Sequence, residues 1–172
     1  MYRVAVVVVL STLGVGQSAF AQFTSCNGSA NLGFRAKISN APSTTTSTTY
    51  VALPGASVTL SVPAASTRIF IVSFSAESRL INNPEPPAGA ASWIELQVRD
   101  NGVAMQPQET TSPLAFASAN LYQSNAATFC GTVTNTTAAT VNHTVSVWWR
   151  IVGATGLTGW LDDWTLRVDK YQ

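Results

Sequence analysis

Apolar and polar residues alternate with a period of two along several stretches of this chain, which is the pattern of a β-strand with one buried face. The clearest stretch is 92–100. One of its faces carries Ile94, Leu96 and Val98, and the other carries Trp93, Glu95, Gln97 and Arg99. Asp100-Asn101-Gly102 follows, and Asn-Gly favours a type I′ hairpin because both of its central residues take a positive φ. The return strand is expected at 103–106.

Three further stretches alternate in the same way, at 67–77, 141–152 and 159–170, and weaker ones occur at 34–39, 49–53, 56–62, 114–121 and 126–134. Proline and glycine mark turns at Pro54-Gly55 and Pro63-Ala64. No window of about 11 residues keeps the spacing of an amphipathic helix. The pattern predicts an all-β chain, folded as an antiparallel, jelly-roll-like β-sandwich of about nine or ten strands.

Residues 1–21 have the three parts of a secretory signal peptide in the right order. Arg3 supplies a basic charge, an unbroken apolar run of seven residues follows at 4–10, and Ala19-Phe20-Ala21 is an A-x-A cleavage motif. A membrane span needs about 20 apolar residues, so the short run favours cleavage over a permanent anchor. The mature chain is expected to start at Gln22, to lack a membrane span, and to be secreted or periplasmic.

Cleavage would leave residues 22–172, a length that suits one domain. We expect an N-terminal segment at 22–48 and a β-sandwich domain at 49–172. The chain has two cysteines, and in an oxidising compartment Cys26 and Cys130 are expected to pair. This disulfide bond would tie the N-terminal segment to a late strand.

The charge of the chain argues against two classes of partner. Nine basic and eight acidic residues nearly cancel, and the loss of Arg3 with the signal peptide leaves eight of each. A neutral surface does not attract nucleic acid or anionic lipid by bulk electrostatics. Charged residues make up 10% of the chain, against roughly 25% in an ordinary domain, so uncharged polar residues must supply most of the polar surface.

The sequence has no pattern that marks an active site, and we expect neither enzyme activity nor a cofactor. His143 is the single histidine, and no G-x-S-x-G motif is present. A glycosidase needs two carboxylates about 5–10 Å apart, and the candidates for such a pair are Glu77, Glu95, Asp162 and Asp163. Asp162 and Asp163 could also supply oxygen ligands to calcium. Their spacing matches no calcium-binding loop, so no metal site is predicted.

The five tryptophans are the most informative residues for function. Trp149 and Trp164 fall in register with aliphatic residues and are expected in the core. Trp93 and Trp148 fall in register with polar residues, so they are expected to be exposed or half-covered. An outward tryptophan can stack on a sugar or anchor a subunit interface, although covering by loops or a second sheet is the alternative. Trp160, beside a glycine, could line a pocket or cap the sandwich.

Three segments, 74–79, 93–96 with 100–102, and 159–166, resemble small exported bacterial β-sandwich domains of unknown function. The likeness covers roughly residues 45–170. This resemblance implies the fold and no particular activity. The general shape is also similar to the jelly-roll heads of complement C1q and tumour necrosis factor proteins, which form trimers, although this chain has no collagen-like stalk.

These features together predict an exported, non-enzymatic protein with a binding or structural role. Assembly into a homo-oligomer is one way in which its outward tryptophans would be used. The alternative is a carbohydrate-active module, either a lectin-like binder or a glycoside hydrolase with a poorly marked active site. The sequence does not identify a ligand or partner.

Overall fold

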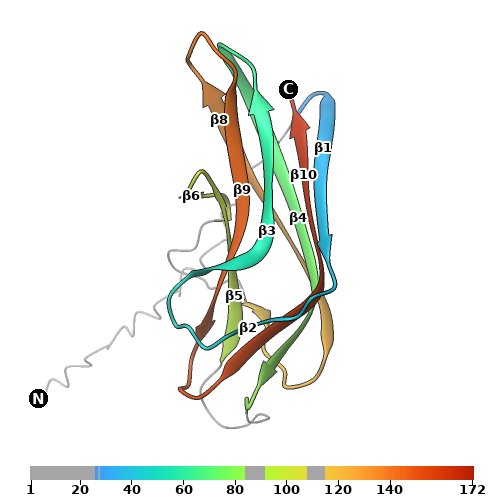
Figure 1. The fold of residues 1–172 in the computed structure, drawn as a ribbon, viewed down its shortest axis with the longest axis vertical. Helices are drawn as coiled ribbons and strands as arrows, with labels where there is room; N and C mark the ends of the chain where they lie inside the picture. Colours follow the sequence, from blue (N-terminus) through green and yellow to red (C-terminus); the bar gives the residue numbers. More distant parts are fainter. Residues whose placement is uncertain (1–25, 27, 84–91, 108–114) are drawn as a thin grey trace, which may run out of the picture.

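The structure is a computed structural model that describes residues 26, 28–83, 92–107 and 115–172. The signal peptide expected at 1–21 lies outside the described residues. Two antiparallel sheets pack face to face (Figure 1). The strands are β1 (Asn31–Ser39), β2 (Ser43–Thr45), β3 (Val51–Val62), β4 (Ser66–Ile81), β5 (Trp93–Asp100), β6 (Val103–Ala104), β7 (Ala115–Ala117), β8 (Gln123–Asn135), β9 (Val141–Val152) and β10 (Thr158–Tyr171). Within the described ranges, no helix has the length and apolarity needed to cross a membrane.

The strand order is that of a jelly roll. One sheet, which we call sheet A, has the order β1-β10-β4-β8 with β2 added beside β10; sheet B has the order β3-β9-β5-β6 with β7 added beside β5. β1 pairs with β10, β3 with β9 and β4 with β8. Each early strand thus pairs with a late one, and each pair lies inside the previous pair along the sequence. Nested antiparallel pairing of this kind characterises jelly rolls. The predicted antiparallel, jelly-roll-like sandwich is therefore confirmed.

The inward faces of the two sheets form one apolar core. On β4, Phe70, Val72 and Phe74 have no exposed surface, whereas the alternate serines are exposed. Trp149 of β9 and Trp164 of β10 are among the largest fully buried side chains, as the alternation predicts. Burial of these large apolar side chains supplies the main free energy that holds the sheets together.

The predicted turn at Pro54-Gly55 is wrong. The stretches expected as two strands at 49–53 and 56–62 are joined in one strand, β3, which begins at Val51. Proline and glycine form a bulge in it, because the pairing with β9 shifts between Ala52 and Ser57 and Gly55 has a φ of 75°. A proline is tolerated here because β3 is an outer strand of sheet B, where a missing N–H need not break a ladder.

A second bulge lies in β10 and is hidden by the sequence pattern. The pairing of β10 with β4 shifts between Asp162 and Thr165. Asp163 is exposed and has a φ of 45°. Because the extra residue changes the phase of the alternation, Leu161 and Trp164 both face the core.

The hairpin after β5 closes one side of the sandwich. Asn101 and Gly102 have φ values of 45° and 86°, so the expected turn with two positive φ angles is confirmed. Beyond β6 the chain crosses to sheet A. There the Gln106 N–H donates to the Cys130 carbonyl oxygen at 2.8 Å, and the Cys130 N–H donates to the Gln106 carbonyl oxygen at 2.7 Å. One backbone pair therefore joins the continuation of sheet B to β8.

The predicted disulfide bond between Cys26 and Cys130 is present and joins the N-terminal segment to β8. Gly28 lies so close to the Tyr171 side chain of β10 that it leaves no room for a Cβ atom. Residues 26 and 28 therefore contact β8 and β10, which flank β4. Other residues of this segment form β1 and β2, and both strands pair with β10.

Candidate binding face

Trp93 and Trp148 lie on the outer face of sheet B. Trp93 is at the start of β5, and Trp148 is on β9, directly opposite Gln97 of β5. Both tryptophans are half-buried. The structure thus brings these two candidates to one face and leaves part of each surface accessible.

Arg99 of β5 lies over the Trp148 ring, with 4.1 Å between the guanidinium carbon and the ring centroid. This cation–π contact orients both side chains. Arg99 Nε donates to Gln97 Oε1 at 2.6 Å, and Trp148 Nε1 donates to Ser146 Oγ at 3.0 Å. The two terminal nitrogens of Arg99 have no hydrogen-bond partner among the described residues.

Tyr50, just before β3, is within cation–π range of two arginines. Its ring centroid is 5.6 Å from the guanidinium carbon of Arg99 and 4.6 Å from that of Arg150. Glu95 is fully buried and accepts hydrogen bonds from the Tyr50 hydroxyl and from Arg150 Nε, the latter at 2.7 Å. A buried carboxylate needs such partners, because leaving it unpaired is strongly destabilising. We call Tyr50, Arg99, Trp148 and Arg150 the Arg–aromatic cluster.

The Arg–aromatic cluster is suited to holding an anionic group. Among the described residues, its two arginines carry two positive charges and the neighbouring Glu95 one negative charge. The Arg150 side chain is 33% exposed and that of Glu95 only 1%, so the surface presents more of the guanidinium than of the carboxylate. A guanidinium group matches the planar geometry of a carboxylate, and side chains already held in place lose less entropy on binding.

Trp160 belongs to a different surface. It lies on the outer face of sheet A, where its ring meets the Tyr122 ring edge-on with 5.1 Å between centroids. The guanidinium carbon of Arg79 is 5.1 Å from the Tyr122 centroid. The ion pair that an i, i+2 spacing allows between Arg79 and Glu77 does not form among the described contacts. Trp160 is therefore not part of one site with Trp93 and Trp148.

The four candidate carboxylates are divided between the two sheets. Glu77 and Asp162 are cross-strand neighbours on sheet A, whereas Glu95 lies on sheet B. The Asp162 carboxylate accepts a hydrogen bond from the Asp163 backbone N–H at 2.8 Å, so these two residues shape the β10 bulge. Within the described ranges, no three side chains of His, Cys, Asp or Glu are placed to hold a metal ion.

His143 forms a hydrogen bond to Asp100 at the end of the core. Its Nδ1 is 2.8 Å from Asp100 Oδ2, and its ring meets Phe70 edge-on with 6.2 Å between centroids. Asn101 is also within hydrogen-bond range. In the described part of the chain, no serine or threonine hydroxyl forms a hydrogen bond with His143. These contacts connect the β5–β6 hairpin to β9.

Asp169 of β10 anchors the first strand of sheet A. It forms two hydrogen bonds with Arg167, each 2.7 Å long, and accepts one from Asn31 of β1 at 3.2 Å. The hydrogen bonds from Arg167 hold the pKa of Asp169 below its ordinary value, partial burial opposes this effect, and the bond from Asn31 supports it. The same contact raises the pKa of Arg167. Asp169 is therefore ionised where β1 joins β10.

Sequence reasoning found the tryptophan of the Arg–aromatic cluster but missed its other members. Arg99 and Arg150 occupy outward positions of the strands expected at 92–100 and 141–152, so the alternation could have placed them on a shared face once the strands were known to pair. Tyr50 had no such signal. It reaches the cluster because β3 pairs with β9, with Val51 opposite Trp149.

No protein-family model matches this chain, and no curated protein matches it either.

Proposed function

We propose that this protein is an exported, non-enzymatic binding protein whose Arg–aromatic cluster recognises a carboxylate-bearing ligand. The observation that carries the proposal is the stacking of Arg99 on Trp148 with both terminal nitrogens of the guanidinium unengaged by described residues. An oriented guanidinium with available donors binds a carboxylate through charge-assisted hydrogen bonds. The flanking aromatic rings offer apolar contact to the rest of the ligand.

Carboxylated sugar residues are the ligand class that best fits this combination. One face of Trp148 is covered by Arg99, which disfavours simple stacking of a neutral sugar on that face. An acidic sugar can engage Arg99 itself and place its ring against a neighbouring aromatic side chain. For the lectin-like function considered from the sequence, we therefore propose acidic glycans as the ligands.

The positions of the carboxylates relative to Trp148 support a non-enzymatic role for this face. Glu95 has both of its oxygens in hydrogen bonds, to Tyr50 and to Arg150, and is shielded from solvent. Glu77 and Asp162 do form a cross-strand pair of carboxylates, but this pair lies on the opposite sheet. Glycoside hydrolysis needs two carboxylates facing one sugar, and these positions do not supply such a pair around Trp148.

The disulfide bond supports the proposal that the protein is exported. Cys26–Cys130 is compatible with an extracellular or periplasmic protein, because structural disulfides persist in oxidising compartments. The proposed signal peptide at 1–21 would deliver the chain there. Mass spectrometry of protein recovered outside the cytoplasm should find Gln22 as the first residue. An intact Met1 in that material would contradict export by cleavage at this site.

The binding proposal is tested on an array of acidic and neutral glycans, followed by titration of the best acidic glycan. Arg99→Ala should weaken binding about tenfold or more, because each lost charge-assisted hydrogen bond is worth about 1.5–3 kcal/mol. Trp148→Ala should weaken it as well, because Arg99 then loses its platform. Arg79→Ala is the matched control, since it removes a comparable cation–π contact on the opposite sheet.

Two results would contradict the proposal. One is the absence of binding to any acidic glycan by the folded wild-type protein. The other is binding that Arg99→Ala and Arg79→Ala reduce equally.

A further inference from the structure

Strand β1 is an exposed edge strand. Eight of its nine positions are exposed and the last is intermediate. Its outward apolar side chains include Phe34, 51% exposed, and Ile38, 73% exposed. A long edge strand of this kind presents unpaired backbone groups to any extended chain that meets it.

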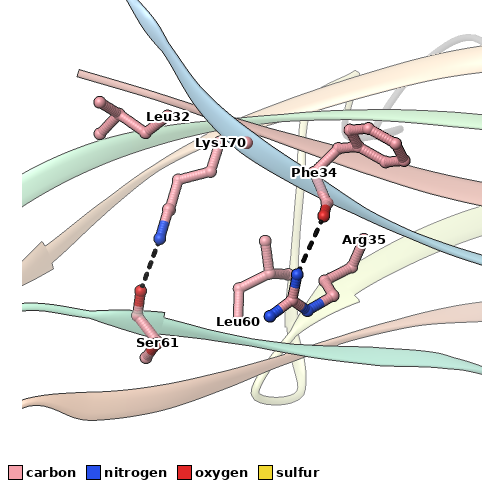
Figure 2. A pocket seen from close by; sticks show the side chains of 7 residues that line it. Leu32, Phe34, Arg35, Leu60, Ser61 and Lys170 are labelled. Atoms are coloured by element: carbon pink, nitrogen blue, oxygen red, sulfur yellow. Dashed lines mark hydrogen bonds between the residues drawn. The ribbon is translucent and has the colours of Figure 1, made fainter.

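The free edge of β1 borders a groove of ≈ 120 Å³ between the two sheets (Figure 2). The groove is lined by Leu32, Gly33, Phe34, Arg35, Leu60, Ser61 and Lys170. Figure 2 shows Lys170 directed toward β3, where its Nζ donates to the Ser61 carbonyl oxygen at 3.2 Å. Arg35 lies on the same side and donates to the Phe34 carbonyl oxygen at 3.3 Å. The lining thus has two cations and no carboxylate.

The charges on β1 oppose pairing with a second copy of itself. β1 pairs regularly with β10 from Phe34 to Ser39. A symmetric antiparallel pair centred on residue 35 would place Arg35 opposite Arg35 of the copy. Centring on 36 places Arg35 opposite Lys37, and centring on 37 places Lys37 opposite Lys37. Like charges directly opposite each other are destabilising.

Registers centred on Phe34 or Ile38 would avoid these pairs. The register centred on Ile38 pairs only residues 37–39 of β1, and the one centred on Phe34 requires Gly33 to take part in the ladder. Gly33 lies in a bulge and has a φ of 116°. Bulges and cations are two means by which edge strands avoid pairing with their own kind. Both are present on β1, so its edge is accessible to another strand, but its positive charges oppose pairing with a second copy of β1.

We propose that β1 binds an extended, acidic segment of a partner polypeptide as an added antiparallel strand of sheet A. The added strand would form main-chain hydrogen bonds to β1, as in other cases of β-strand addition. Its acidic residues would lie opposite Arg35 and Lys37, and its alternate apolar residues would cover Phe34, Ala36 and Ile38. Because side chains alternate between faces along a strand, the partner segment needs acidic and apolar residues in alternation.

This site is separate from the Arg–aromatic cluster. β1 is the outer strand of sheet A, and the cluster lies on the outer face of sheet B. Either proposal can therefore fail alone. If an acidic peptide binds at the Arg–aromatic cluster instead of at β1, the backbone amide signals that shift will show it.

The proposal is tested with a short capped peptide in which glutamate and valine alternate, added to the isotope-labelled, disulfide-bonded protein. We expect backbone amide signals of β1 to shift, with little change on β5 and β9. The matched peptide with lysine in place of glutamate should bind about tenfold or more weakly, because two cross-strand pairs change from attraction to repulsion. The double variant Arg35→Glu with Lys37→Glu should reverse this preference.

Three outcomes would overturn the proposal. The glutamate peptide could leave the β1 signals unchanged. It could shift β5 and β9 around Arg99 instead, which would support the proposed function alone. The charge-reversed double variant could keep the wild-type preference while its amide spectrum shows a folded protein, which would exclude recognition through Arg35 and Lys37.

Discussion

The two sides of the sandwich, where the edges of the two sheets meet, are built in different ways. On one side, β6 and β7 cover the edge of β5, and Gln106 pairs with Cys130 of β8. The disulfide bond to Cys26 adds a covalent tie at the same residue. On the other side, β1 and β3 each pair with one described strand only, and a groove lies between them.

This difference shows two solutions to the problem of exposed sheet edges. The β8 side is closed at one point, by the backbone pair of Gln106 with Cys130. Met105 beside this pair is 4% exposed, although a hollow of ≈ 210 Å³ lies between β6 and β8. The β1 side is protected by cations and by the bulges at Gly33 and Pro54-Gly55. Closing an edge favours stability, whereas a charged open edge keeps backbone groups available to a partner. On this account the linked β8 side contributes more to stability, and the β1 side is the one proposed to bind a partner strand.

The largest effect is expected from breaking the covalent tie on the closed side. The double variant Cys26→Ser with Cys130→Ser should lower the free energy of unfolding by about 2–5 kcal/mol, since the disulfide closes a long loop with a sequence separation of 104. Chemical denaturation of the variant and of the oxidised wild type measures this difference. A loss below about 0.5 kcal/mol would show that the bond contributes little to the closure.

The next effect is expected from the packing on the same side. Met105→Ala should cost about 2–5 kcal/mol, because Met105 is buried and packs over Gly131 of β8, and truncation would leave a cavity. Denaturation midpoints of wild type and variant give the value. An unchanged midpoint would mean that the closed side is not a packed part of the core.

A smaller, pH-dependent effect is expected at Asp169, which joins Asn31 of β1 to β10. Its pKa is lowered in the folded protein, chiefly by hydrogen bonds from Arg167. Its ionised form therefore stabilises the fold above the unfolded-state pKa of about 3.9, and this contribution is lost as the pH falls through the lower folded-state pKa.

Unfolding curves of wild type and Asp169→Asn, recorded across this pH range, should converge in acid and separate toward neutral pH. The wild type should be the more stable protein at neutral pH. A difference independent of pH would assign the effect to packing and not to ionisation.

The smallest effect is expected on the open side. Ile38→Ala should change the free energy of unfolding by less than about 0.5 kcal/mol, because Ile38 is 73% exposed. It serves as the matched control for Met105→Ala. A loss as large as that of Met105→Ala would mean that the side chain of Ile38 is covered in solution, and would remove the contrast between the two sides.

The sequence predicts the elements that depend on local signals. The strand of β5 and its turn at Asn101-Gly102 follow from short-range alternation and from the φ preference of two residues. Pro54-Gly55 misleads because tertiary pairing with β9 converts a turn signal into a bulge. The bulge at Asp163 is invisible because one extra residue between two good alternating runs leaves no mark in composition.

The candidate site is predicted less well, because its members come from three strands or their ends. Alternation places Trp148 outward, but the approach of Arg99 depends on the register between β5 and β9. The contact of Tyr50 with Arg150 depends in turn on the pairing of β3 with β9. Register between distant strands is a property of the whole fold, and one sequence does not specify it in advance.

The central claim, that Arg35 and Lys37 keep the open β1 edge from pairing with itself, is tested most directly by sedimentation of charge variants. Arg35→Glu alone should promote dimers, because the register centred on residue 36 then places glutamate opposite Lys37 twice. The double variant Arg35→Glu with Lys37→Glu should show no more self-association than wild type, since its charges are again alike. Equal self-association of all three proteins would contradict the claim. A dimer that buries β1 and that forms in both the wild type and the double variant would contradict it as well.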